Sequence, residues 1–176
     1  MEQPAGNKIT GNPSSHPALS VKWVEDFPDI PLNRNEAYKL RVTSKGVEIE
    51  AITETGVYRA IQTLRQLTEK KGNGIAITGC EITDWPAFRI RGFMQDVGRT
   101  YISTDELKRE IAILARYKIN VFHWHLTENQ AWRLQSKVFP MLNDSVNTTR
   151  QPGKYYTLEE ARELAAFCKQ HHVLLI

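Results

Sequence analysis

The chain has 176 residues, of which 41% are hydrophobic and 24% are charged. This composition is typical of a globular protein with a buried core, so we do not expect a disordered chain. The 23 basic and 20 acidic residues give a net charge of +3 and are interspersed. Without a block of Lys and Arg, the sequence predicts no nucleic-acid partner.

The N-terminal residues, about 1–18, are rich in Pro, Gly, Ser and Asn. They predict a flexible lead or the remnant of an upstream strand. They show neither the basic start nor the apolar stretch of a signal peptide, and no later stretch is as long as a transmembrane helix. We therefore expect no membrane partner. The compartment stays open, because a periplasmic, secreted or lysosomal protein whose signal peptide has been removed would look the same.

The next part of the chain, residues 19–86, predicts a small α+β domain. Apolar and polar residues alternate on both sides of a turn at 44–46, which indicates a hairpin with one solvated face. Apolar residues then recur at helical spacing over 57–67, with Lys70 and Lys71 placed near the helix end. Ile75, Ile77 and Ile82 indicate one or two further strands.

From residue 87 the chain alternates strand and helix. Both helices begin with the capping-box pattern, in which Ser or Thr precedes Glu by three residues. Strand, helix, strand, helix, strand indicates parallel strands with right-handed crossovers, as in a doubly wound sheet or a (β/α)8 barrel. The strands are expected at 88–96, 120–126 and 173–176, and the helices start at Ser103 and Thr157.

Polar and aromatic residues gather where the first two of these strands end, which is where α/β enzymes place their sites. Arg99 offers a rigid fork of donors for two neighbouring hydroxyls, or it forms a salt bridge with Asp96 or Glu128. Trp132 and Tyr101 are candidates for stacking on a sugar face, or for an aromatic lid over the core.

His123 and His125 alternate with Trp124, so in a strand both imidazoles share one face. Such a pair suits a metal-dependent hydrolase when later strands add ligands. Two ligands are too few to hold a metal, and we favour a polar pocket lining. Cys80 and Cys168 lie far apart without CxxC spacing, so they predict no metal or redox motif, and two separate thiols are favoured over a disulfide.

Several motifs occur together in one order. The second half contains Arg91-Gly92, Asp96-Val-Gly-Arg99, Tyr117-Lys-Ile-Asn120 and FHWHLTENQAWR at 122–133; the first half contains Gly46-Val-Glu-Ile, GVYRA at 56–60, TLRQL at 63–67 and ITDWPAF at 82–88. This series resembles family 20 of the glycoside hydrolases, the β-N-acetylhexosaminidases. The resemblance covers nearly everything after the first eighteen or so residues.

Composition assigns residues 1–18 to a flexible N-terminal lead. The resemblance implies a small α+β domain at 19–86 and, at 87–176, the N-terminal part of a (β/α)8 TIM barrel that stops after its third strand. It also implies retaining exo-hydrolysis of terminal β-linked N-acetylglucosamine or N-acetylgalactosamine, assisted by the 2-acetamido group of the substrate. The catalytic Asp-Glu pair of the family follows the fourth barrel strand and is expected beyond Ile176. No catalytic residue, cofactor or metal is therefore assigned within these residues.

Three positions match the substrate-binding residues of the family. Arg99 matches the arginine that binds hydroxyls of the terminal sugar. Glu128 matches an acidic position that usually carries aspartate, and His125 lines the same pocket wall. The expected partner is a glycan with terminal β-linked N-acetylhexosamine. The fragment alone is expected to be inactive and to self-associate through exposed barrel edges, while a non-catalytic carbohydrate-binding fragment is the alternative.

Overall fold

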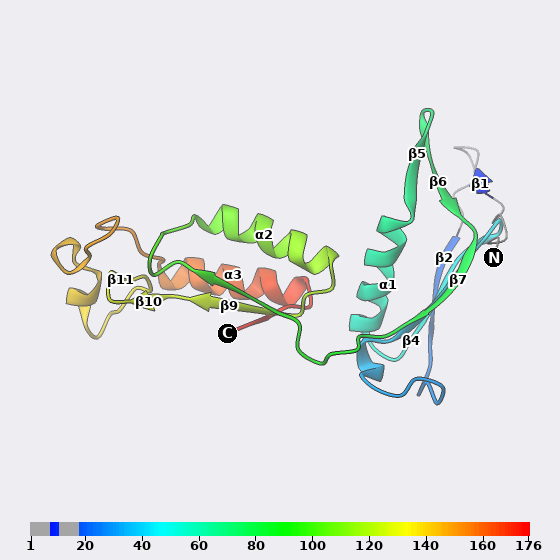
Figure 1. Ribbon diagram of the computed structural model, residues 1–176, viewed down its shortest axis with the longest axis horizontal. Helices are drawn as coiled ribbons and strands as arrows, with labels where there is room; N and C mark the ends of the chain where they lie inside the picture. The colour runs from blue at the N-terminus through cyan, green and yellow to red at the C-terminus, as the bar shows by residue number, and fades with distance from the viewer. Residues whose placement is uncertain (1–7, 11–17) are drawn as a thin grey trace. The chain divides into compact units, whose positions relative to one another are not determined.

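The structure is a computed structural model that describes residues 8–10 and 18–176 (Figure 1). The chain divides into two compact units, Met1–Arg89 and Ile90–Ile176. Both units combine helices with strands, so the predicted α/β class is confirmed. No helix among the described residues is long and apolar enough to cross a membrane.

The first unit is built on a four-stranded sheet with one helix against it. The predicted hairpin is present, because β3 (Tyr38–Thr43) pairs antiparallel with β4 (Gly46–Ala51). The sheet order is β2-β4-β3-β7, with β2 spanning Ala18–Trp23 and β7 spanning Cys80–Asp84. Helix α1 (Glu54–Gln66) contacts β3 and β4 and closes a core over one sheet face. Buried residues of this core are Tyr38, Leu40, Val42, Val47, Ile49, Ala51 and Ala60.

A second, smaller sheet of this unit has the order β1-β6-β5. It consists of β1 (Lys8–Thr10), β5 (Thr68–Lys71) and β6 (Gly74–Thr78). The prediction that Lys70 and Lys71 lie near the end of a helix is wrong, since both lie in β5. The Thr68 hydroxyl donates to the Leu64 carbonyl at 2.9 Å, and Gly72 turns the chain back with φ 59°.

Three of the N-terminal residues form strand β1. Lys8–Thr10 pairs antiparallel with β6, so these residues form a strand, which was the second of the two predicted alternatives for the lead. Residues 1–7 and 11–17 of the predicted lead lie outside the described residues.

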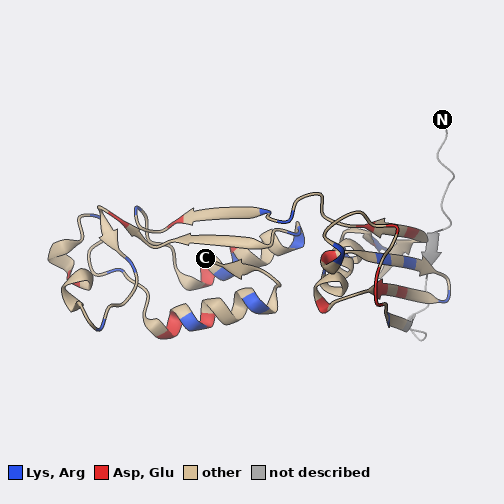
Figure 2. Ribbon diagram, turned by 90° about the horizontal axis from the view of Figure 1, so that it is seen from below, with Lys and Arg blue, Asp and Glu red and all other residues tan. Residues whose placement is uncertain are grey.

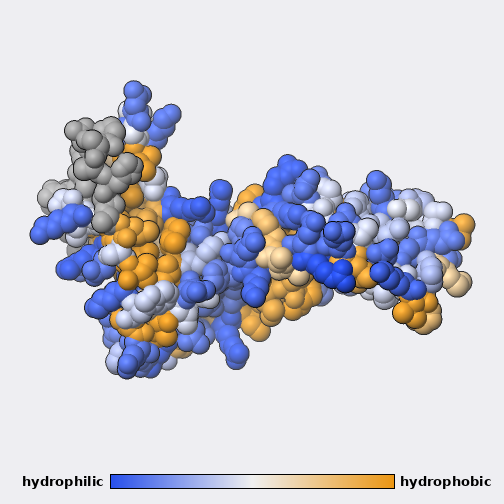
Figure 3. Space-filling view, turned by 180° about the vertical axis from the view of Figure 1, so that it is seen from behind, coloured by the Kyte–Doolittle hydropathy of each residue, from blue (hydrophilic) through white to orange (hydrophobic). Residues whose placement is uncertain are grey.

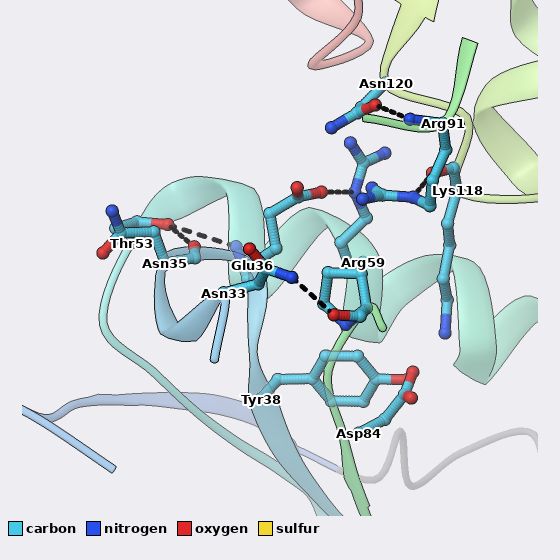
Figure 4. Close-up of polar contacts among 12 residues, drawn as sticks. Asn33, Asn35, Glu36, Tyr38, Thr53, Arg59, Asp84, Arg91, Lys118 and Asn120 are labelled. Carbon is cyan, nitrogen blue, oxygen red and sulfur yellow. Dashed lines mark hydrogen bonds and ion pairs between the residues drawn. The ribbon is translucent and has the colours of Figure 1, made fainter. Parts of the chain in front are cut away.

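Buried polar contacts join the helix of the first unit to the 3-10 helix η1 (Arg34–Glu36) and to the sheet (Figure 4). The Arg59 side chain on α1 is only 2% exposed, and its Nε lies 2.9 Å from the Glu36 carboxylate. The Tyr38 hydroxyl donates to Asp84 at 2.8 Å and contacts the Thr63 hydroxyl at 2.6 Å. Burial raises the pKa of Tyr38, so this phenol stays protonated and able to donate.

The second unit is a three-stranded parallel sheet covered by two helices. Strand β9 (Val121–His125) lies between β8 (Gly92–Asp96) and β12 (Leu174–Leu175). Helices α2 (Thr104–Arg116) and α3 (Leu158–Gln170) lie side by side against one face of the sheet (Figures 1 and 2). Both helices begin with the predicted capping boxes, and both parallel crossovers are confirmed.

The first strand of this unit is shorter than predicted. It begins at Gly92 rather than Phe88, because its ladder with β9 starts at the pair Gly92 and Val121. Before that point, the Arg91 amide donates to the Asn120 side-chain oxygen at 2.8 Å (Figure 4). The Asn120 amide in turn donates to the Arg91 carbonyl at 3.0 Å. The Phe88 side chain is 73% exposed, so it takes no part in a sheet core.

The two faces of the parallel sheet differ in character. Phe122 and Trp124 of β9 are buried beneath the helices, and Phe93 of β8 lies 6.3 Å from Phe122 between ring centroids. His123 and His125 point to the opposite face, as their alternation with Trp124 predicts.

A long connection joins β9 to α3. It contains a short hairpin whose strands, β10 (Thr127–Glu128) and β11 (Ala131–Trp132), have two residues each. The 3-10 helices η2 (Pro140–Asn143) and η3 (Ser145–Asn147) follow. Figure 2 shows both signs of charge along the helices of the second unit, and Figure 3 shows hydrophobic side chains open to solvent in both units. Large exposed apolar residues include Leu19, Trp23, Met94, Phe139 and Met141.

Candidate functional site

The three predicted site residues lie together where β8 and β9 end. Arg99 stands three residues past the end of β8, and its Nη2 donates to Glu128 Oε1 at 2.8 Å. Its Nη1 donates to Asp96 Oδ2 at 2.7 Å. The same Glu128 oxygen lies 3.1 Å from His125 Nε2. The structure thus brings Arg99, Glu128 and His125 into one cluster and adds Asp96 to it.

The parallel pairing of β8 with β9 places two members of this cluster, Asp96 and His125, next to each other. Asp96 is the last residue of β8 and His125 is the last residue of β9, and the two are register partners. Side chains at partner positions of adjacent strands point to the same face, so both project from the face that the helices leave uncovered. Glu128 follows in β10 and approaches the same point from the hairpin.

A tight turn after β8 delivers Arg99. The amides of Val97 and Gly98 both donate to the His125 carbonyl, at 3.1 and 3.2 Å, and the Arg99 amide donates to Asp96 Oδ1 at 3.0 Å. Gly98 passes so close to the hairpin that an added Cβ would lie 3.0 Å from the Glu128 Cβ. Glycine is therefore required for the turn to rest against Glu128.

The electrostatics of the site favour an ionised Asp96 carboxylate beside the Arg99 guanidinium. Partial burial raises the pKa of Asp96, but the Arg99 backbone N–H and the charges of Arg99 and His125 outweigh it, so the pKa lies below its usual range. The Arg99 side chain remains 56% exposed, whereas Glu128 is 24% exposed. The carboxylates hold the arginine from beneath and leave it open to solvent.

The Arg99 guanidinium has more N–H donors than its two carboxylate partners use. A guanidinium has about five N–H donors in a fixed planar fork. Within the described residues, the side chain of Arg99 donates one bond to Asp96 and one to Glu128. The remaining donors are available to vicinal hydroxyls of a ligand, which suit a planar fork. Both predicted alternatives for Arg99, a fork of donors and a salt bridge, are therefore compatible with one geometry.

The two candidate aromatic residues differ in accessibility. Trp132 on β11 is 39% exposed. Tyr101 packs against Tyr156 at 4.8 Å between centroids and lies 5.9 Å from Lys154 Nζ. Of the two, Trp132 is the aromatic ring that a ligand could reach, while Tyr101 belongs to the packing around the long loop.

The histidine pair does not make the metal site that its spacing suggests. The rings of His123 and His125 lie 5.7 Å apart, but the metal-capable group among the described residues is Asp96, His125 and Glu128. The carboxylates of this group already share the Arg99 guanidinium at 2.7 and 2.8 Å. A cation would have to compete with that internal charge.

Two members of this neighbourhood were not among the predicted site residues. Asp96 is visible in the sequence as an acid at a strand end, and the sequence indicates it only as a salt-bridge partner. Arg133 is fully buried, which the sequence does not signal because arginine is rarely buried. Burial lowers the pKa of its guanidinium, an effect partly opposed by Tyr156 and Tyr101.

An acid-held arginine at the carboxyl ends of parallel strands is the kind of site that binds polar, hydroxyl-bearing ligands in α/β enzymes. Residues 88–176 match the family described as glycosyl hydrolase family 20, catalytic domain, and residues 4–85 match glycosyl hydrolase family 20, domain 2. The chain belongs to glycosyl hydrolase family 20, as its motifs predict.

Relatives and solved structures agree with this assignment. A beta-hexosaminidase of Porphyromonas gingivalis is 38% identical over 99% of this chain and 22% of the relative. The exo beta-N-acetylglucosaminidase of Vibrio harveyi, solved with N-acetylglucosamine, has a TM-score of 0.77 and is 32% identical over 89% of this chain and 26% of its own. The beta-N-acetylhexosaminidase of Bacteroides fragilis has a TM-score of 0.78 and 30% identity over 93% of this chain and 33% of its own. The chain spans about a quarter of the curated relatives it matches, 22% and 25% for two of them.

Proposed function

We propose that these residues are part of a retaining exo-β-N-acetylhexosaminidase that removes terminal β-linked N-acetylglucosamine or N-acetylgalactosamine from glycans. The observation that carries the proposal is the fork of Arg99, held by Asp96 and Glu128 and open to solvent. Membership of family 20 and the N-acetylglucosamine in the Vibrio harveyi structure support the choice of sugar.

The fold proposal is that 19–86 form the small domain before a (β/α)8 barrel and 87–176 form the first part of that barrel. Two features support it. The parallel strands follow one another in chain order, β8-β9-β12, and α2 and α3 cover the same face. When successive strands are added at the same edge of a parallel sheet through right-handed crossovers, all helices lie on one face of the sheet. The other face is then available to form the interior of a barrel. Strands β8 and β12 then bind further strands at their free edges, or other copies of residues 1–176 in their absence.

Each site residue has a proposed part in binding the terminal sugar. Arg99 donates to neighbouring hydroxyls on the nonreducing side of the ring. Glu128 fixes the guanidinium from below, and His125 fixes Glu128 through the 3.1 Å contact. Trp132 offers an exposed ring for stacking against the sugar.

The proposed chemistry follows the substrate-assisted scheme of the family. The 2-acetamido oxygen attacks the anomeric carbon while a glutamic acid protonates the leaving oxygen, and an aspartate orients the acetamido group. Water then opens the cyclic intermediate with retention of configuration. The Asp-Glu pair is proposed to follow a fourth barrel strand beyond Ile176, and no cofactor takes part.

The test is Arg99→Ala in the longer protein that contains these residues, with Arg109→Ala as the matched control. Arg109 is exposed on α2 and donates one 3.3 Å bond to the Asp105 carbonyl. Loss of a charge-assisted hydroxyl contact should lower kcat/KM on an aryl β-N-acetylglucosaminide about 100-fold, against less than about twofold for the control. Unchanged kcat/KM in Arg99→Ala would remove Arg99 from the site. Binding of N-acetylglucosamine without any turnover by the unaltered protein would indicate a non-catalytic carbohydrate-binding protein.

A further inference from the structure

We propose that Arg133 is a positioning residue that fixes the turn carrying Arg99 against the loop at 150–154, and so sets the geometry of the sugar-binding fork. The inference rests on the proposed function, because it assigns a supporting part to a residue that does not touch the substrate. Arg133 follows β11 directly and is fully buried, with 0% of its surface exposed.

The guanidinium of Arg133 has an unusual set of partners. All its bonds within the described residues go to backbone carbonyls, and no carboxylate is among them. Nε donates to Val97 at 3.0 Å, and Nη2 donates to Gly98 at 3.3 Å. The remaining bonds reach the loop, to Arg150 at 2.8 Å, Gln151 at 3.2 Å and Lys154 at 2.7 Å. Five N–H donors thus meet five acceptors, which is the full donor capacity of arginine.

This arrangement joins two segments that are distant in sequence. Val97 and Gly98 form the turn that leads into Arg99, and their amides are already bound to the His125 carbonyl on one side. Arg133 binds their carbonyls on the other. The turn is therefore held from both directions, which restricts where the Arg99 side chain can begin.

The loop on the opposite side of Arg133 has a backbone conformation that needs support. Gln151 has φ 52° and Gly153 has φ 72°. A left-handed conformation is unfavourable for glutamine, so surrounding contacts must hold it. Arg133 supplies bonds to the carbonyls of Arg150, Gln151 and Lys154, and the Gln151 side chain in turn accepts the Tyr101 amide at 2.5 Å. The loop and the turn are therefore parts of one hydrogen-bonded unit.

A lysine cannot replace this arginine. Lysine has about three donors on one nitrogen, and they cannot reach both sides of a planar fork. A buried cation also needs each of its donors satisfied to offset its desolvation. Arg133→Lys should therefore release either the turn or the loop while keeping the charge.

The first measurement is amide hydrogen exchange of residues 1–176 carrying Arg133→Lys, beside Arg109→Lys as the matched control. We expect exchange to accelerate about tenfold or more at 97–101 and 150–156, with little change in β8, β9 and the helices. Unchanged protection at 97–101 would overturn the proposal. Should the lysine variant fail to fold, Arg133→Gln, which keeps two N–H donors without the charge, is measured instead. Loss of folded protein in both variants would assign Arg133 to general stability and also overturn it.

The second measurement separates positioning from stability through kinetics of the longer protein. Arg133→Lys should raise KM about tenfold with a smaller effect on kcat, and this effect should nearly disappear when Arg99→Ala is already present. Additive effects in the double variant would show that Arg133 does not act through Arg99. An unaltered protein without turnover would contradict the proposed function, while the exchange result would still decide whether Arg133 holds the turn.

Discussion

The close approach of the Arg99 turn to the hairpin can be tested with a single methyl group. In Gly98→Ala the new Cβ would lie 3.0 Å from the Glu128 Cβ, 3.1 Å from its Cγ and 3.1 Å from its backbone nitrogen. The Glu128 Cγ could rotate away, but the Cβ and the backbone nitrogen are fixed by the backbone of β10 and cannot move without disturbing the hairpin. The turn must therefore separate from Glu128.

The cost follows from overpacking a fitted contact. Inserting one methyl group where neighbours cannot relax destabilises a protein by about 1–3 kcal/mol. For a chain of this size each kcal/mol corresponds to a fall in Tm of roughly 2–4 °C. Gly98→Ala should therefore lower Tm by about 2–12 °C and weaken the 2.8 Å contact between Arg99 and Glu128.

Gly92→Ala is the matched control in the same unit. Its added Cβ would lie 3.8 Å from the Val121 Cβ, an ordinary van der Waals distance. We expect its Tm to stay within about 2 °C of the unaltered chain, because contacts at this distance carry no steric penalty. Thermal unfolding of both variants is the assay. Equal Tm values for Gly98→Ala and Gly92→Ala would refute the argument that Gly98 is needed for close approach.

Three further predictions concern pH, capping and thiol reactivity. The pKa of Asp96 is lowered on folding, so its stabilising contribution is full above the unfolded value of 3.8 and is lost as pH falls through the folded value. Asp96→Asn should therefore lower Tm at pH 7, and the Tm difference from the unaltered chain should shrink as pH falls through the folded value; a difference that does not shrink would contradict the assignment. Ser103→Ala removes the capping box of α2 and should cost about 1 kcal/mol in urea unfolding, and no loss would contradict the cap. Burial raises the pKa of Cys168 to about 11, so a thiol reagent should modify Cys80 first in the folded chain, and the reverse order would contradict the burial.

Much of the fold follows from local patterns in the sequence. The hairpin of β3 and β4 was predictable because alternation on both sides of a turn reports one buried face, and its burial alternates accordingly. Both helices of the second unit were predictable from their capping boxes, which satisfy the first amides of each helix within a few residues. These signals are local, so no tertiary information is needed.

The predicted ends of strands and helices are wrong where contacts with a distant part of the chain determine them. Residues 88–91 alternate apolar and polar side chains as a strand does, but the hydrogen-bonded pairing with β9 begins only at Gly92. Lys70 and Lys71 suit the end of a helix, yet they pair with β6 because Gly72 turns the chain back at once. In both cases the partner strand determines the boundary, and the sequence does not show the partner.

In the candidate site, the sequence likewise predicts the positions of the residues but not the contacts between them. The positions of Arg99, His125 and Glu128 at strand ends were predictable from the strand pattern and the family motifs. The sharing of one Glu128 oxygen by Arg99 and His125 was not, because it depends on a hairpin of two-residue strands. The five backbone bonds of Arg133 were likewise unpredictable, since they join segments that only the fold brings together.

The central claim is tested most directly by measuring turnover of an aryl β-N-acetylglucosaminide and the matching aryl β-glucoside. Both substrates are given to the longer protein and, side by side, to residues 1–176 alone. Because the substrate supplies the nucleophile through its 2-acetamido group, the account predicts that the longer protein hydrolyses only the N-acetylglucosaminide and that residues 1–176 hydrolyse neither. Comparable turnover of the glucoside, or turnover of the N-acetylglucosaminide by residues 1–176, would contradict it.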